Sequence, residues 1–298
     1  MQHSPLLQQL DEALQHQGYI AESSILTSIY LARQLQRPLL VEGPPGVGKT
    51  EIAKVLSKIQ ETELIRLQCY EGLGAEQAIY DWNYQRQLLA LKMMERETLS
   101  LEEKENFIFD EKFLLKRPLL KAISQEKSPV LLIDEVDRAD EEFESFLLEL
   151  LSDWQISIPE TGVIQATHIP TVIITSNRMR DLSDALRRRC FYLWIDYPAF
   201  DKELKIVRQK IPQIDEQLGI QICKFMQEIR QMKLNKLPGI AETLDWAQAL
   251  TALHIDHLEP ELVESTLGIV LKDWQDIRST QMSLSELFDK VGIISKVK

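Results

Sequence analysis

One eight-residue segment restricts the fold of this 298-residue chain more than any other feature. Residues 43–50 read GPPGVGKT and fit the pattern GxxxxGK[ST]. They follow an apolar run at 39–41 that is typical of a buried parallel strand, and they precede helical periodicity at 51–59. A glycine-rich loop between a strand and a helix turns its main-chain N–H groups inward around phosphate oxygens. The sequence therefore predicts a phosphate-binding loop.

Each residue type in this loop has a chemical reason. The glycines permit tight torsions and a close approach of the backbone, and the following helix presents its positive N-terminal end. Lys49 supplies a charge for the β- and γ-phosphates of ATP, and the Thr50 hydroxyl is expected to bind Mg²⁺. The predicted nucleotide-binding residues are Gly43, Pro44, Pro45, Gly46, Val47, Gly48, Lys49, Thr50 and Glu51.

Two carboxylates end a second apolar run. Residues 130–133 read VLLI, and Asp134 and Glu135 follow directly. In a phosphate-loop sheet this strand ends beside the loop, which would place Asp134 to bind Mg²⁺ and Glu135 to polarise the attacking water. The alternative is that these carboxylates only add solubility, but two of them after four apolar residues, downstream of a phosphate loop, favour the metal and water roles.

Strand and helix signals alternate over the first two thirds of the chain. Apolar runs predict further strands at 64–68, 171–175 and 191–195, and strand signals cease after residue 198. The alternation predicts an α/β fold with a parallel sheet covered by helices. We expect two domains, residues 1–200 with N-terminal helices and a mixed, polar, helix-prone segment at 70–117, and a helical domain at 201–298.

Polar and cationic residues follow the strand predicted at 171–175. A polar residue at Ser176 or Asn177 is placed to reach the γ-phosphate and the water. Arg187, Arg188 and Arg189 then close a short helix. They are either a solvated cationic helix end favoured by the helix dipole or an arginine finger that reaches the nucleotide of a neighbouring subunit.

Composition excludes several classes of partner. The net charge of −12 and the pI near 5.0 oppose binding to duplex nucleic acid. No apolar run reaches the ~18–20 residues that cross a bilayer, and the N-terminal segment lacks a basic start followed by an apolar stretch. We therefore expect no membrane association and a cytoplasmic location. The three cysteines have no metal-binding spacing and are expected to be reduced thiols.

The order of these motifs resembles the AAA+ ATPases. GPPGVGKT, LLIDE, TSN and the arginine cluster come in that order and precede a helical tail. The stretches LIRLQCYEGLGAEQAIYDWNYQRQLL, LLIDEVDRADEEFESFLLELL, IPETG and KLPGIAETLDWAQAL are more closely similar to the MoxR family, in the branch around CoxD-like ATPases. The resemblance covers roughly residues 15–255.

The resemblance implies an αβα P-loop core followed by an all-helical lid domain, assembled as a hexameric ring with nucleotide at the subunit interfaces. By match to the family pattern, residues 70–117 are an insertion in the core and Asn177 is the sensor 1 residue. Arg189 is the preferred finger, and Arg187 and Arg188 are rivals. Gln68 would hold Glu135 away from water until assembly.

Two weaker assignments and one departure come from the same resemblance. Arg138 matches an interface arginine, and the segment around Tyr19 and Ile20 is where family members contact adenine. MoxR relatives often carry an arginine, sensor 2, at the start of a lid helix, but residues 239–243 read GIAET here. Either the lid is coupled to ATP more weakly, or another cation substitutes.

The leading hypothesis is a Mg-ATP-hydrolysing ATPase that remodels or helps to mature a client protein, with a von Willebrand A domain protein as partner. One alternative is a nucleotide-gated binding module with little turnover. Another is a DNA-associated AAA+ motor, against which the net charge and the 70–117 segment argue.

Overall fold

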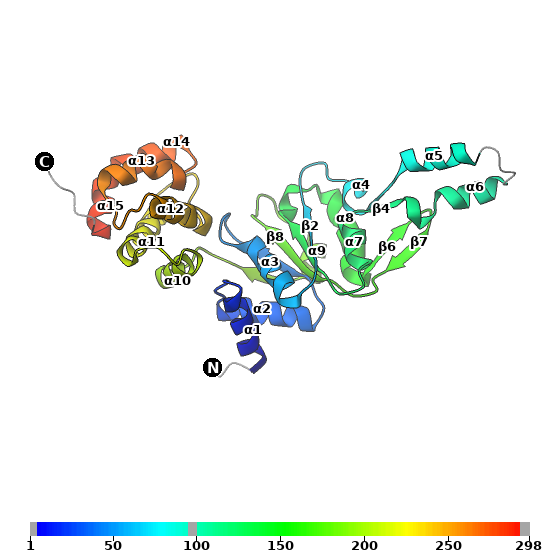
Figure 1. The fold of residues 1–298 in the computed structure, drawn as a ribbon, viewed down its shortest axis with the longest axis horizontal. Coiled ribbons are helices and arrows are strands. Elements are labelled where there is room, and N and C mark those ends of the chain that lie inside the picture. The colour runs from blue at the N-terminus through cyan, green and yellow to red at the C-terminus, as the bar shows by residue number, and fades with distance from the viewer. Residues whose placement is uncertain (1–4, 95–99, 293–298) are drawn as a thin grey trace. The chain divides into compact units, whose positions relative to one another are not determined.

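The computed structural model describes residues 5–94 and 100–292, and its contacts divide the chain into two units (Figure 1). Unit 1 consists of the described residues within Met1–Glu22, Gly43–Glu51 and Ile195–Lys298. Unit 2 consists of those within Ser23–Glu42 and Ile52–Trp194. The phosphate loop is thus grouped with the C-terminal helices. The ends of the predicted N-terminal and C-terminal helical segments, at 1–4 and 293–298, and residues 95–99 of the predicted insertion lie outside the described residues.

A five-stranded sheet in the order β2-β5-β8-β1-β9 forms the centre of unit 2, and every neighbouring pair is parallel. Its strands are β1 (Leu39–Glu42), β2 (Leu64–Gln68), β5 (Val130–Asp134), β8 (Thr171–Ser176) and β9 (Phe191–Trp194). β1 and β5 are buried along their whole length, as expected where helices cover both faces of a sheet. The predicted α/β fold with a parallel sheet is confirmed.

Amphipathic helices pack on this sheet. The principal ones are α2 (Ser23–Gln34), α3 (Lys49–Gln60), α7 (Pro118–Ile123), α8 (Glu141–Asp153) and α9 (Asp184–Arg189). In α8, Phe143, Leu147 and Leu150 recur at helical spacing and are buried in the same core as β5. A 3₁₀ turn, η2 (Val136–Arg138), separates β5 from α8.

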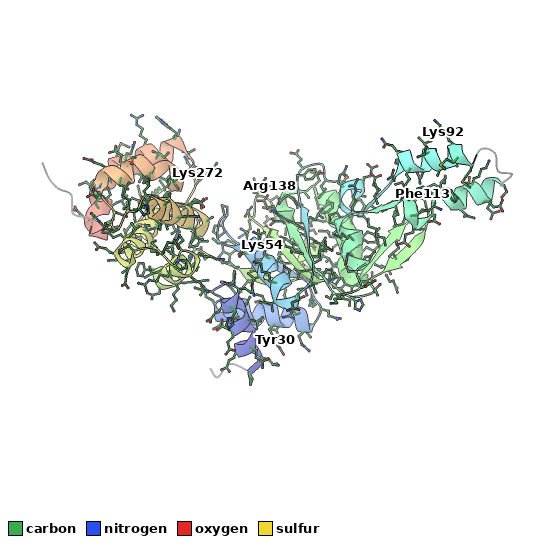
Figure 2. All side chains as sticks on the ribbon, in the orientation of Figure 1. Tyr30, Lys54, Lys92, Phe113, Arg138 and Lys272 are labelled. Carbon is green, nitrogen blue, oxygen red and sulfur yellow. The ribbon has the colours of Figure 1, made fainter. Side chains whose placement is uncertain are left out.

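The segment predicted as an insertion forms an arm built on a small antiparallel ribbon. The ribbon pairs β3 (Tyr80–Trp82) with β4 (Leu114–Lys116), and α5 (Tyr84–Met93) and α6 (Leu101–Ile108) lie between them in sequence and beside each other in Figure 1. Short elements flank the ribbon, namely α4 (Ala75–Ala78) and η1 (Glu111–Phe113). Figure 2 marks Lys92 on α5 and Phe113 at the end of η1, directly before β4.

A second ribbon follows α8. β6 (Gln155–Ile158) and β7 (Gly162–Gln165) are antiparallel, and Gly162, the first residue of β7 after the turn, has a φ of +91°. A glycine is suited to this position because L side chains rarely adopt such a φ. β6 and β7 therefore form a hairpin whose turn contains Thr161.

Unit 1 is helical apart from its connecting loops. Its helices are α1 (Pro5–His16), α10 (Phe200–Lys210), α11 (Glu216–Gln231), α12 (Ile240–Ala252), α13 (Pro260–Val270), α14 (Trp274–Met282) and α15 (Leu284–Val291). Phe225, Trp246 and Phe288 are in ring contact within its core. The predicted helical C-terminal region is confirmed, whereas the domain boundary near residue 200 stays a prediction.

Among residues 5–94 and 100–292, no helix is both long enough and apolar enough to span a bilayer.

We predict that the native protein reacts very slowly with a thiol reagent such as DTNB at pH 8. Cys69, Cys190 and Cys223 are all buried, and burial raises the pKa of each thiol to about 12. The reactive species is the thiolate, so three buried thiols with raised pKa values present almost none of it at that pH. In denaturant all three should react, and a thiol that is titrated within seconds in the native protein would contradict this account.

Candidate active site

The parallel register of the sheet brings the polar ends of its strands to one edge. Gln68 lies opposite Asp134 across β2 and β5, and Glu42 lies opposite Ser176 across β1 and β8. Ligands of open α/β sheets bind outside the carboxyl ends of the strands. This edge, from which the chain runs out of β1 into the phosphate loop, is therefore the candidate active site of unit 2.

Asp134 is held firmly at the end of β5. Its side chain is almost fully buried, Oδ1 accepts a hydrogen bond from Thr175 Oγ1 at 2.5 Å, and Oδ2 pairs with Arg66 Nη2 at 2.5 Å. A carboxylate in this position has the chemistry that Mg²⁺ takes as a ligand. Sequence reasoning did not single out Arg66, because its proximity to Asp134 depends on the pairing of β2 with β5.

Glu135 adopts an unusual backbone conformation. Its φ is +54° and its ψ is +50°, in the left-handed region, and its N–H donates to Thr175 Oγ1 at 2.9 Å. Such a conformation in a non-glycine residue is associated with a strained functional position. It turns the chain sharply at the end of β5.

Three side chains hold the Glu135 carboxylate. Oε2 accepts from Gln68 Nε2 at 3.0 Å and pairs with Arg138 Nε at 3.0 Å, and Oε1 accepts from Asn177 Nδ2 at 3.3 Å. Arg138 is labelled in Figure 2. The structure thus brings together four residues that the sequence had marked separately. Their roles in catalysis remain predictions.

Asp137 is a site residue that the sequence analysis missed. It is buried, and its Oδ2 accepts the main-chain N–H groups of Asn177 at 3.0 Å and Met179 at 2.8 Å. A single carboxylate therefore fixes the backbone on which Asn177 stands. The available signal was its place two residues after Glu135, but only the fold shows what it binds.

A second buried carboxylate, Glu42, ends β1 just before the phosphate loop. It accepts hydrogen bonds from Arg187 Nη2 at 3.3 Å and from the Tyr192 hydroxyl at 3.1 Å, and Arg178 Nε lies 3.7 Å from it. Burial and the hydrogen bond with Glu42 raise the pKa of Tyr192. The sequence alone did not single out Glu42, because its partners lie on other elements of the fold.

The three candidate finger arginines differ in their surroundings. Arg187 is bound to Glu42, and the Arg189 guanidinium donates to Ser152 Oγ and, at 2.9 Å, to the Ala185 carbonyl. Arg188 is exposed. Arg37 fixes their backbone, with Nη2 donating to the Arg188 carbonyl at 2.6 Å.

In unit 1 the phosphate loop has the form that the sequence predicted. Gly46 and Gly48 have φ values of +75° and +91°, and α3 begins at Lys49. Lys49 is buried, and its Nζ donates to the carbonyls of Gly43 at 2.8 Å and Pro44 at 2.7 Å. These features fit the phosphate chain of a nucleotide, because the glycine torsions and the helix N-terminus are what a phosphate cradle requires.

Three further residues that the sequence predicted belong to unit 1, namely Glu51 after the phosphate loop and Tyr19 and Ile20 after α1. Glu51 Oε1 lies 3.5 Å from Lys210 Nζ on α10. Tyr19 and Ile20 are half-buried after α1, and burial, with a smaller contribution from Glu51, raises the pKa of Tyr19. Their contact with adenine stays a prediction.

Known proteins that are similar to this chain point to the same fold. The sequence profile of the family described as AAA domain (dynein-related subfamily) matches residues 38–190. The chain is similar to uncharacterized proteins of Staphylococcus aureus strains bovine RF122 / ET3-1 and NCTC 8325 / PS 47, each 26% identical over 249 residues, covering 79% of this chain and 86% of the relative. A solved structure of a Thermotoga maritima RuvB point mutant is 18% identical, with 97% of this chain and 83% of that chain covered and a TM-score of 0.50. This structural likeness supports the fold alone.

We predict that Asp137→Ala destabilises the protein by about 2–3 kcal/mol, because it leaves two main-chain N–H groups without their charged acceptor. Urea denaturation followed by fluorescence measures the change. Asp181→Ala is the matched control, because that side chain is 89% exposed, and it should stay within about 0.5 kcal/mol of wild type. Equal denaturation midpoints for the two variants would show that Asp137 does not secure this loop.

Proposed function

The chain belongs to the dynein-related subfamily of AAA domains, and on that premise we propose that it is a Mg-ATP-hydrolysing ATPase of the MoxR type. One observation carries the proposal: the Glu135 carboxylate, next to Asp134 at the end of β5, is held by Gln68, Arg138 and Asn177. A purely structural carboxylate does not require a left-handed backbone and three donors from three different segments.

Each role follows from the chemistry of a side chain. When bound, Mg-ATP supplies the phosphoryl group and the metal charge. Lys49 would neutralise phosphate oxygens, and Thr50 and Asp134 would hold the metal. Glu135 would accept the proton of the attacking water at a carboxylate oxygen, and Asn177 would orient that water.

In this proposal, Gln68 and Arg138 regulate the rate of ATP hydrolysis. Both interact with Oε2 of Glu135, so this oxygen is engaged by Gln68 and Arg138 and is not available to a water molecule. We propose that assembly with another copy of the chain withdraws one of these donors. Turnover would then depend on oligomerisation, as in a ring whose nucleotide lies between subunits.

The finer role follows from sequence likeness. The segments IPETG and KLPGIAETLDWAQAL resemble the MoxR family, so we propose a remodelling or maturation role towards a client protein, with a von Willebrand A domain partner and a hexameric assembly. Pull-down from the native host with the Glu135→Gln protein as bait tests this part. Recovery of nucleic acid in place of protein would redirect it to a DNA-associated motor.

We predict that Glu135→Gln binds ATP but hydrolyses it at least about 100-fold more slowly, because the amide cannot accept the proton. Lys49→Ala should lose nucleotide binding. Phosphate release and fluorescent-ATP binding measure the two steps. Glu142→Gln, an exposed change on α8, is the control and should match wild type. Hydrolysis at the wild-type rate by Glu135→Gln would make the catalytic assignment wrong.

We predict that Arg188→Ala abolishes hydrolysis and that activity returns when it is mixed with Lys49→Ala. If the finger reaches the nucleotide of a neighbouring subunit, mixed assemblies regain complete sites. In these sites Arg188→Ala supplies the intact nucleotide pocket and Lys49→Ala supplies the intact finger. Arg188 is our choice because Arg187 and Arg189 are bound within their own chain. Arg187→Ala and Arg189→Ala are compared in the same mixing assay, and whichever variant is complemented identifies the finger. If none is complemented, the finger does not act between subunits.

A further inference from the structure

The start of α12 is hydrogen-bonded to the phosphate loop within unit 1. The Gly46 carbonyl accepts the N–H groups of Ile240 at 2.9 Å and Ala241 at 3.3 Å. We call these three residues, together with Gly239, the clasp. A Cβ added to Gly239 would lie 2.8 Å from the backbone atoms of Gly46, so the two segments meet at a distance that admits no side chain at this position.

The rigidity of the peptide bond gives this contact a consequence inside the loop. The Gly46 carbonyl and the Val47 N–H belong to one planar, trans peptide group, in which the two dipoles point in opposite directions. The donors of α12 that hold the carbonyl therefore aim the Val47 N–H the other way, away from α12. A hydrogen-bonded carbonyl also makes the N–H of its own peptide group a stronger donor.

A buried ion pair braces the clasp from within the helical unit. Arg230 Nη1 and Nη2 each lie 2.7 Å from a Glu203 oxygen, and the Thr243 hydroxyl donates to Glu203 at 2.6 Å. The same guanidinium donates to the carbonyls of Pro238 at 2.8 Å and Gly239 at 3.3 Å.

The burial of these groups makes the brace rigid. The Glu203 side chain is fully buried and that of Arg230 is 6% exposed. A buried pair of this kind is tolerated only when its hydrogen bonds are nearly all made, and any shift of one group leaves another charge unpaired. The backbone that precedes α12 is thereby held in one place.

We propose that the clasp sets the affinity of the phosphate loop for nucleotide, by orienting the Val47 N–H through the Gly46 carbonyl. Gly239 and Arg230 are then positioning residues of the nucleotide site. The inference rests on the proposed function and deepens it. It also bears on residues 239–243, where MoxR relatives often carry an arginine and this chain does not. Here α12 acts on the loop through its main chain, and Arg230 acts on the backbone of the clasp.

The decisive comparison is Ile240→Pro against Ile240→Ala. Both variants remove the isoleucine side chain, but only proline removes the N–H that donates to Gly46. Proline is otherwise accepted here, because Ile240 is the first residue of α12 and Gly239 before it is extended, with φ −87° and ψ −169°. We expect fluorescent ADP to bind Ile240→Pro about three- to tenfold more weakly than Ile240→Ala, the effect of one lost hydrogen bond. Thermal melting of both variants shows whether the helical unit remains folded.

Amide hydrogen exchange without nucleotide provides a readout that does not depend on the ATPase. Exchange in residues 46–51 should be faster in Ile240→Pro than in Ile240→Ala, while the core of α11 stays protected. Equal ADP affinities, or equal exchange in the loop, would overturn the clasp. If wild type binds no nucleotide, the proposed function fails, and the exchange result alone decides whether α12 holds the loop.

A second pair of variants covers the case in which Ile240→Pro fails to fold. Gly239→Ala introduces the Cβ that meets Gly46 and should weaken ADP binding and speed its release. Gly268→Ala is the matched control in α13, where an added Cβ meets no atom within 4 Å, and it should bind ADP as wild type does. Equal release rates for these two variants would overturn the proposal.

Discussion

The parallel register of β2-β5-β8-β1-β9 is the constraint on which the candidate site depends. Parallel strands end at one edge, and this register sets Gln68 opposite Asp134 and Glu42 opposite Ser176. A shift of β1 or β5 by one residue would turn each of its side chains to the opposite face of the packed core and would move Glu42 or Asp134 away from its partner at this edge. The polar chemistry at the edge is therefore positioned by the packing of the apolar residues beneath it.

The polar groups at this edge then restrain one another. Thr175 donates its hydroxyl hydrogen to Asp134 and accepts the N–H of Glu135, so one hydroxyl links both carboxylates to β8. Asp137 fixes the backbone of Asn177, whose amide reaches Glu135. A left-handed glutamate costs roughly 1–3 kcal/mol of strain, which persists only where the surroundings determine the conformation in this way. This restraint orients the carboxylate before any substrate binds.

The sequence predicted the elements whose signal is local. The five strands of the sheet, the phosphate loop and the pair at the end of β5 were read from apolar runs and from the residues that follow them. The ribbon of β3 and β4 was missed because each strand has three residues and pairs across the 84–113 segment. Arg66 and Glu42 were missed for a related reason: a charged residue acquires its role from a partner on another strand, and register is not visible in a single sequence.

The N-terminus of α12 shows why a local rule can yield to a tertiary contact. Ser, Thr, Asp or Asn is preferred before a helix, because its side chain accepts an N–H of the first turn. Gly239 occupies that place here, since a Cβ would meet the backbone of Gly46. Glu242 reaches back instead and accepts the Gly239 N–H at 2.8 Å, while the Gly46 carbonyl accepts the N–H groups of the first two helical residues, Ile240 and Ala241. The helix end therefore satisfies its first donors on the phosphate loop, which ties the order of one segment to the position of the other.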